Sequence, residues 1–215
     1  MAFHGWPAEA LEFFEGLEVD NSKTYWTEHK AFYDGQVLQP MQELLTELAP
    51  QFGEGRVFRP YRDVRFSADK SPYKTNIAAH LPAGYLSLSA RGLAAGRGMY
   101  VMATDQLERY RRAVDAERTG QELVALAAAL RRKKIEVTGH EMLKSAPRGY
   151  AKDHPRVELL RHKGVVAWKE WPVAAWLGTK AAKERIAQFL AEAAALDEWL
   201  QRHVGPSTVE AAAAR

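Results

Sequence analysis

The alternation of apolar and polar residues in the middle of the chain limits its fold more than any other feature of the sequence. Between Arg56 and Ala103, short segments repeat with a period of two, which is the spacing of side chains on one face of a β-strand. The segments before and after this block repeat mainly with the period of an amphipathic helix. This order predicts an α+β protein whose central antiparallel sheet is flanked by N-terminal and C-terminal helices.

Helices are expected on both sides of the strand block. The run 7–17 carries apolar residues at helical spacing, and Asn21 or Ser22 is expected to cap a second, aromatic-rich helix. Gly35 and Pro40 predict a break before the next helical segment. After the block, the sequence predicts helices over 105–116 and 120–134, strands over 135–139 and 165–171, a short helix after Pro155 and a closing helix.

The length and composition suit one compact domain. The 215 residues are 47% hydrophobic, which is enough to bury one sizeable core. We predict a single α+β domain over residues 1–204 and a flexible tail over residues 205–215, where no apolar repeat occurs. The chain has no cysteine, which excludes disulfides and thiolate nucleophiles. No basic leader and no apolar run of about 20 residues occurs, so we expect a cytoplasmic protein with no membrane partner.

Charge and motifs narrow the classes of function. The 30 basic and 27 acidic residues leave a net charge of +3, a smaller excess than a dedicated nucleic-acid-binding protein carries. The seven histidines lack the spacing of a metal site, and no nucleophile motif, phosphate loop or dinucleotide fingerprint occurs. We therefore expect no metal and no cofactor. The sequence favours neither an enzyme nor a non-catalytic protein, and it predicts no oligomeric state.

The segment RDVRFSADKSPYK, residues 62–74, concentrates charge around two aromatic residues. We interpret residues 61–67 as a strand at the sheet edge. Asp63 is expected to hold Arg62 or Arg65 through charge-assisted hydrogen bonds, and a guanidinium held in this way still has donors for an anion. The candidate ligand-binding residues of this segment are Arg62, Asp63, Arg65, Asp69, Lys70, Tyr73 and Lys74.

These residue types suit an anionic ligand. Lys70 and Lys74 supply positive charge, and Tyr73 supplies a stacking surface or a hydroxyl group. Asp69 can accept hydrogen bonds from nearby backbone N–H groups and so order the loop. A phosphate, a carboxylate or a nucleotide would fit. The same residues also suit a structural role, in which neighbouring pairs, Arg62 with Asp63 and Asp69 with Lys70, neutralise one another and fix a loop to the sheet.

A second candidate group lies in the segment APRGYAKDHPRVELLRHKG, residues 146–164. Lys152 is a candidate ligand-binding residue, and His154 is the candidate acid or base. A turn that caps a helix around Asp153 is the alternative interpretation of His154, and it is the one that the sequence favours. If the segment 62–74 is a binding site, we expect the fold to bring Lys152 or His154 close to it, since binding groups usually converge from separate elements.

The segment RDVRFSADKSPYK resembles the hallmark of a family known as domain of unknown function 2461, which is widespread in bacteria. The resemblance extends to DNSKTYWTEHKAFYD near the N-terminus, to GRGMY and to APRGYAKDHPRVELLRHKG, so it spans most of the chain. It implies a bacterial protein with a single α+β domain, and it assigns no activity, substrate or catalytic residue. Tyr61 and Asp20 stand where asparagine is common in the family, so we expect no mechanism that needs an amide at those positions.

Three functions follow from these observations. The first is the binding of an anionic small molecule at the basic, aromatic loop, with or without catalysis. The second is a nucleic-acid-associated module that adds Arg56 and Arg59 to the same basic residues. The third is a scaffold or interaction protein whose charge network is purely structural. A concave site with convergent side chains would favour the first, a flat basic strip the second, and paired, buried charges the third.

Overall fold

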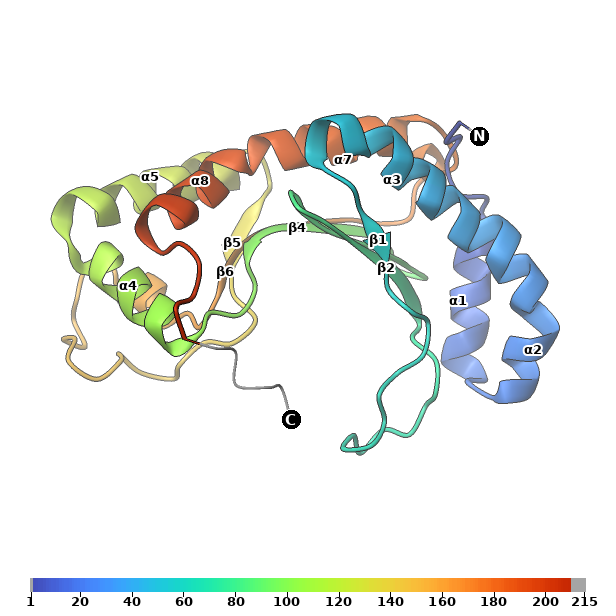
Figure 1. Ribbon diagram of the computed structural model, residues 1–215, viewed down its shortest axis with the longest axis horizontal. Helices are drawn as coiled ribbons and strands as arrows, with labels where there is room; N and C mark the ends of the chain where they lie inside the picture. The colour runs from blue at the N-terminus through green and yellow to red at the C-terminus, as the bar shows by residue number, and fades with distance from the viewer. Residues whose placement is uncertain (1, 210–215) are drawn as a thin grey trace. The chain divides into compact units, whose positions relative to one another are not determined.

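The structure is a computed structural model that describes residues 2–209 (Figure 1). Within these residues, six strands form one sheet in the order β1-β2-β3-β4-β6-β5. The strands are β1 (Arg56–Val57), β2 (Asn76–Leu81), β3 (Gly84–Ser89), β4 (Gly92–Met99), β5 (Glu136–Thr138) and β6 (Val165–Trp171). The prediction of an α+β fold, with a central antiparallel sheet and helices from both ends of the chain, is confirmed.

Helices precede and follow the first four strands. The N-terminal helices are α1 (Glu9–Val19), α2 (Lys23–Phe32), the π-helical segment η1 (Tyr33–Leu38) and α3 (Gln39–Phe52). The later helices are α4 (Thr104–Asp115), α5 (Glu117–Arg132), α6 (Val157–Leu160), the short 3-10 helix η2 (Ala175–Gly178), α7 (Ala181–Glu192) and α8 (Ala194–His203). No helix among the described residues has the length and the apolar character needed to cross a membrane.

The described residues divide into two compact units. The first unit contains the residues up to Ala95 together with Glu170–Leu190, and the second contains Gly96–Lys169 together with the residues from Ala191 onward. The single domain expected over residues 1–204 stays a prediction.

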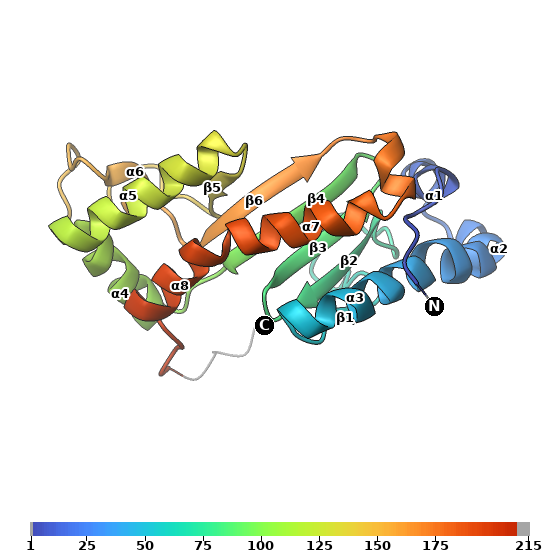
Figure 2. The same ribbon diagram turned by 90° about the horizontal axis from the view of Figure 1, so that it is seen from above.

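The apolar face of the sheet in the first unit packs against helices. Strands β2 and β3 pair in antiparallel register, with Ile77 opposite Leu88 and His80 opposite Tyr85. Ile77 and Leu88 are buried, α1 and α3 contact these strands, and α7 lies over the same face in Figure 2. Because side chains alternate along a strand, His80 and Tyr85 lie on the opposite face, which is more exposed.

The break predicted at Gly35 and Pro40 is wrong, because the chain is helical without interruption from Lys23 to Phe52. Proline has no N–H group to donate, and its ring crowds the carbonyl four residues earlier in an α-helix. The π-helical segment η1 ends just before Pro40, and the N–H group of Gln39 donates to the carbonyl of Asp34, five residues back. We attribute the continuous helix to this wider turn, which gives the proline ring more room.

The strand predicted over residues 61–67 is also wrong. Residues 58–75, which we call the 58–75 loop, form a long projection between β1 and β2 (Figure 1). Its two sides pair only at the base, where the N–H group of Arg62 donates to the carbonyl of Pro72 at 2.9 Å and that of Lys74 donates to the carbonyl of Pro60 at 2.8 Å. The prolines lack N–H groups and the aspartate side chains bind nearby backbone, so the segment turns instead of extending a ladder.

Helices α4, α5 and α8 pack together in the second unit, around the buried side chains of Tyr110 and Trp199. Part of the segment expected to be a flexible tail is bound to α4. Gln106 donates to the carbonyl of Gly205 at 2.8 Å, and Arg109 donates to the carbonyl of Pro206 at 2.7 Å. Residues 210–215 of the expected tail lie outside the described residues.

Candidate anion-binding site

Asn21 fixes the base of the 58–75 loop to the end of α1. Its side-chain oxygen accepts a hydrogen bond from the N–H group of Tyr73 at 2.9 Å. Its NH₂ group lies within hydrogen-bond distance of the carbonyls of Tyr73, at 3.2 Å, and Leu17, at 3.1 Å. One amide group therefore holds both backbone polar groups of Tyr73 in place.

Tyr73 packs against aromatic residues at the same point. Its side chain is only 5% exposed, and its ring stacks on that of Trp26 with the ring centroids 4.5 Å apart and the planes 9° from parallel. The ring of Tyr61 lies 5.5 Å away on the other side of the loop base. Tyr73 thus orders the loop, and one face of its ring is already covered by the protein.

The charged residues farther along the loop bind one another. Arg65 donates from Nε to Asp63 Oδ1 at 2.9 Å and from Nη2 to Asp63 Oδ2 at 2.7 Å, which confirms that Asp63 holds an arginine. Arg62 forms an ion pair with Asp69, and Lys70 donates to the carbonyl of Val64 at 3.0 Å. The pairs therefore differ from the sequence neighbours proposed for a purely structural network. Each arginine pairs with a carboxylate that is not its sequence neighbour, since Asp63 is two residues from Arg65 and Asp69 is seven residues from Arg62.

These interactions keep both aspartates ionised. The hydrogen bonds from the side chain and backbone N–H of Arg65 lower the pKa of Asp63 to about 2. Hydrogen bonds from Ser71, followed by that from the guanidinium of Arg62, hold the pKa of Asp69 well below its usual range. The loop therefore keeps its internal pairs throughout the physiological pH range.

We expect Asp63→Ala to change the melting temperature by less than about 2 °C, because the lost ion pair is open to water. Arg65 is 76% exposed, so it is hydrated after its partner is removed. The loss of this pair should therefore cost little stability. Thermal unfolding followed by circular dichroism would test it, with Lys70→Ala in the same loop as the comparison. A much larger loss for Asp63→Ala would show that the pair supports the fold.

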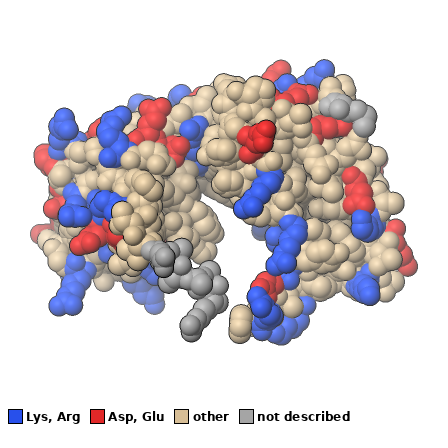
Figure 3. Space-filling model, viewed as in Figure 1, with Lys and Arg blue, Asp and Glu red and all other residues tan. Residues whose placement is uncertain are grey.

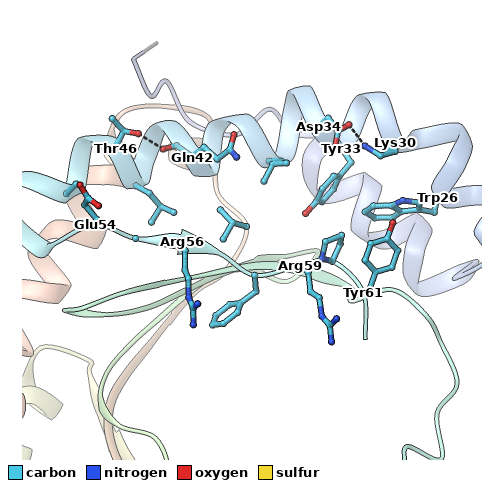
Figure 4. A pocket seen from close by; sticks show the side chains of 17 residues that line it. Trp26, Lys30, Tyr33, Asp34, Gln42, Thr46, Glu54, Arg56, Arg59 and Tyr61 are labelled. Atoms are coloured by element: carbon cyan, nitrogen blue, oxygen red, sulfur yellow. Dashed lines mark hydrogen bonds and ion pairs between the residues drawn. The ribbon is translucent and has the colours of Figure 1, made fainter. Parts of the chain in front are cut away.

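Three cations at the base of the loop are arranged differently. Among the described residues, the side chains of Arg56, Arg59 and Lys74 form no hydrogen bond or ion pair. Arg56 and Arg59 point to the same side of the chain, away from α3 (Figure 4). Burial, and then the neighbouring charge of Arg59, lowers the pKa of Lys74. Figure 3 shows that Lys and Arg side chains gather over β1 and the 58–75 loop.

Aromatic and polar side chains of the open sheet face adjoin these cations. Arg56 lies opposite His80 in the β1–β2 register, and His80 lies opposite Tyr85. The rings of Phe58 and Tyr85 are 6.4 Å apart, and Lys74 Nζ lies 5.5 Å from the centroid of Phe58. We call this surface the basic face, and it consists of Arg56, Phe58, Arg59, Lys74, His80 and Tyr85.

The second candidate group lies in the other unit. Lys152 is exposed, whereas His154 is held in a turn: its Nδ1 accepts a hydrogen bond from the N–H group of Arg156 at 3.0 Å, and its Nε2 is 3.2 Å from Asp115 Oδ1. The ring of His154, two residues before Arg156, therefore orders this turn. The expected approach of Lys152 or His154 to the 58–75 loop stays a prediction.

The structure also identifies residues that sequence reasoning missed. Arg156 has a side chain that is only 5% exposed. It donates to the carbonyls of Val114 and Asp115, each at 2.7 Å, and to the Glu117 carboxylate at 3.0 Å. Arginine beside a proline is typical of an exposed first helical turn, so no local pattern marked it. The role of Asn21 was equally hidden, because its partner Tyr73 is 52 positions away.

No group of three or more His, Asp or Glu side chains within residues 2–209 is arranged to hold a metal ion.

The fold and the site define an α+β protein in which the basic face lies beside the 58–75 loop, whose base is fixed by Asn21. A family model described as a conserved hypothetical protein, DUF2461, matches residues 9–199. The chain belongs to this family. No significant match to the chain was found among curated proteins or among solved structures.

Proposed function

We propose that the protein binds a phosphorylated small molecule, such as a nucleotide, on its basic face. The observation that carries the proposal is the grouping of Arg56, Arg59 and Lys74 at the base of the loop, where none of the three forms a hydrogen bond or ion pair with a carboxylate of the described residues. Like charges that lie close together repel, and an anion that binds between them removes this cost. Burial is the larger cause of the lowered pKa of Lys74, and the neighbouring charge of Arg59 lowers it further.

The surrounding side chains favour a phosphate that is joined to an aromatic group. Arginine matches the geometry of a phosphate through its planar set of donors, and lysine adds a compact positive charge. Phe58 and Tyr85 offer ring surface next to these cations, on which a nucleobase could stack. The paired residues of the loop, by contrast, are less suited to bind an anion, since their charges are already neutralised by one another.

A single-stranded nucleic acid is the second candidate ligand. The specific observation in its favour is that the cations and rings lie on an exposed face of an antiparallel sheet, a surface on which bases can spread and stack. The two ligands differ in how binding depends on salt. Each phosphate contact adds to the slope of log Kd against log salt concentration, so an oligonucleotide gives a steeper dependence than a mononucleotide.

Isothermal titration calorimetry with ATP, inorganic phosphate and oligothymidylate tests the proposal. We expect ATP to bind, and Arg59→Ala and Lys74→Ala each to weaken its binding by about tenfold or more, because each removes a charge-assisted contact. Arg118→Ala and Lys23→Ala remove exposed cations elsewhere on the surface and serve as matched controls.

Two results would reject the small-molecule proposal. The first is that the parent protein does not bind ATP, or that the control substitutions weaken ATP binding as much as Arg59→Ala and Lys74→Ala do. The other is oligothymidylate binding that is tighter than ATP binding and steeply dependent on salt, which would favour the nucleic-acid alternative.

A further inference from the structure

A pocket of about 850 Å³ lies on the other side of β1 from the basic face (Figure 4). Its walls come from α2, η1 and α3 on one side and from residues 54–61 on the other. The apolar and aromatic residues of the lining include Trp26, Tyr33, Leu38, Leu45, Val57 and Tyr61. This volume is typical of sites that enclose most of a small organic ligand, so the pocket can hold more than solvent.

Tyr33 supplies an unused polar group inside this pocket. Its side chain is 4% exposed, and its hydroxyl group points from the helix toward the space above β1 in Figure 4. The hydroxyl forms no hydrogen bond with another residue of the part of the chain that the structure describes. A donor that faces a pocket and has no protein partner is available to a ligand that enters the pocket.

The protonation state of Tyr33 determines whether its hydroxyl group can donate a hydrogen bond. Burial, and then the negative charge of Asp34, raises the pKa of Tyr33 to about 12. The phenol is therefore protonated at neutral pH and can donate a hydrogen bond. Tyr33 also begins the π-helical segment η1, and such segments occur frequently at functional sites.

The charges around the pocket argue against an anionic ligand there. Lys30 is paired with Asp34, and the side chains of Arg56 and Arg59 point away from the pocket. The carboxylate of Glu54, also in the described lining, would repel a carboxylate ligand. A neutral ligand with an apolar body can pack against the apolar lining. One acceptor oxygen on this ligand can accept a hydrogen bond from the hydroxyl group of Tyr33.

We propose that this pocket binds an apolar small molecule that carries one uncharged carbonyl group, with Tyr33 donating to the carbonyl oxygen. Arg56, Phe58 and Arg59 belong both to the pocket lining and to the basic face. The ligand proposed here lies on the side of β1 that faces Tyr33, so the proposal does not depend on the anionic ligand proposed for the basic face. The acceptor, and not only the apolar area, then determines which ligands bind.

Three naphthalene compounds of similar shape test this site: 2-acetonaphthone, which has a ketone, 2-ethylnaphthalene, which has no acceptor, and 2-naphthoate, which is charged. Binding to the full chain is measured by two-dimensional NMR titration, which also reports which backbone amides shift. We expect the ketone to bind about tenfold more tightly than the hydrocarbon and more tightly than the carboxylate, and to shift signals from residues of α2, η1 and α3.

Two variants separate the hydrogen bond from the apolar surface. Tyr33→Phe removes only the hydroxyl group, so it is expected to lower the affinity for the ketone about tenfold and to leave that for the hydrocarbon unchanged. Ala49→Phe places a bulky side chain in the lining and is expected to prevent binding of both. The melting temperature of each variant shows that it is folded.

The proposal is overturned if the parent protein binds none of the three compounds, or if Tyr33→Phe binds the ketone as the parent does. It is also overturned if sedimentation shows a dimer that Ala49→Phe separates into monomers, since a second copy of the chain would then occupy the pocket.

Discussion

Replacing Arg156 with alanine should lower the free energy of unfolding by about 3 kcal/mol, the largest stability effect that we expect. The guanidinium of Arg156 is buried and donates to two backbone carbonyls at the end of α4 and to Glu117. The substitution removes these donors, leaves the carbonyls of Val114 and Asp115 without them and opens a cavity. Urea denaturation followed by far-UV circular dichroism measures the loss.

Arg202→Ala is the matched control for this experiment. The Arg202 side chain is 61% exposed and has a single ion pair, with Glu122 at 3.3 Å, so we expect a change within about 0.5 kcal/mol. Arg156→Lys keeps the charge but cannot supply three donors in the same plane, and it should recover only part of the stability. Equal losses for Arg156→Ala and Arg202→Ala would contradict a structural role for the buried guanidinium.

Asn21→Ala should lower the free energy of unfolding by about 2 kcal/mol and loosen the base of the 58–75 loop. The substitution leaves the N–H and carbonyl groups of Tyr73 without their side-chain partner at a partly buried position. Amide hydrogen exchange at Tyr73 should become faster by at least about tenfold, since its protection then depends on local opening. Hydrogen-exchange NMR measures this rate for the single amide.

Two further variants identify the cause of the effect. Asn21→Asp keeps an acceptor for the Tyr73 N–H group but places the second carboxylate oxygen against the carbonyls of Leu17 and Tyr73, so it should also be destabilising. Asn76→Ala removes an asparagine with one side-chain hydrogen bond, to Ser87, and should cost less. If Asn21→Ala leaves the exchange rate at Tyr73 unchanged, the hydrogen bonds between Asn21 and the backbone of Tyr73 do not order the loop.

The strands and most helices were predictable because their side chains follow simple periods. The alternation around Ile77 and His80 reflects two sheet faces with different surroundings, so it indicates a strand before any partner is known. The continuous helix through Gly35 and Pro40 was not predictable in this way. Both residues disfavour an α-helix, and the π-helical turn that accommodates them depends on packing around Tyr33 and Val37, which are buried.

The candidate site was predicted in composition but not in arrangement. The sequence indicated that Asp63 would hold an arginine, and the structure identifies that arginine as Arg65. It could not indicate that Asp69 is the partner of Arg62, because that pair depends on the path of the loop. The paired cations and the unpaired ones at Arg56 and Arg59 look alike in a sequence, since the difference lies in which carboxylates the fold brings near.

The closed base of the 58–75 loop makes the tip of the loop independent of the rest of the fold. Strands β1 and β2 pair with each other, and Asn21 joins the returning side of the loop to α1, so both ends of the loop are anchored without help from the residues between them. The tip itself exposes Phe66, which is 89% accessible, and buries no core residue of its own. The two sides of the loop are therefore held together by the β1–β2 pairing and by Asn21, and not by the covalent connection through the tip. The segment between Arg62 and Pro72 can accept insertions, or exchange for a different sequence, while the sheet on either side of it keeps its register.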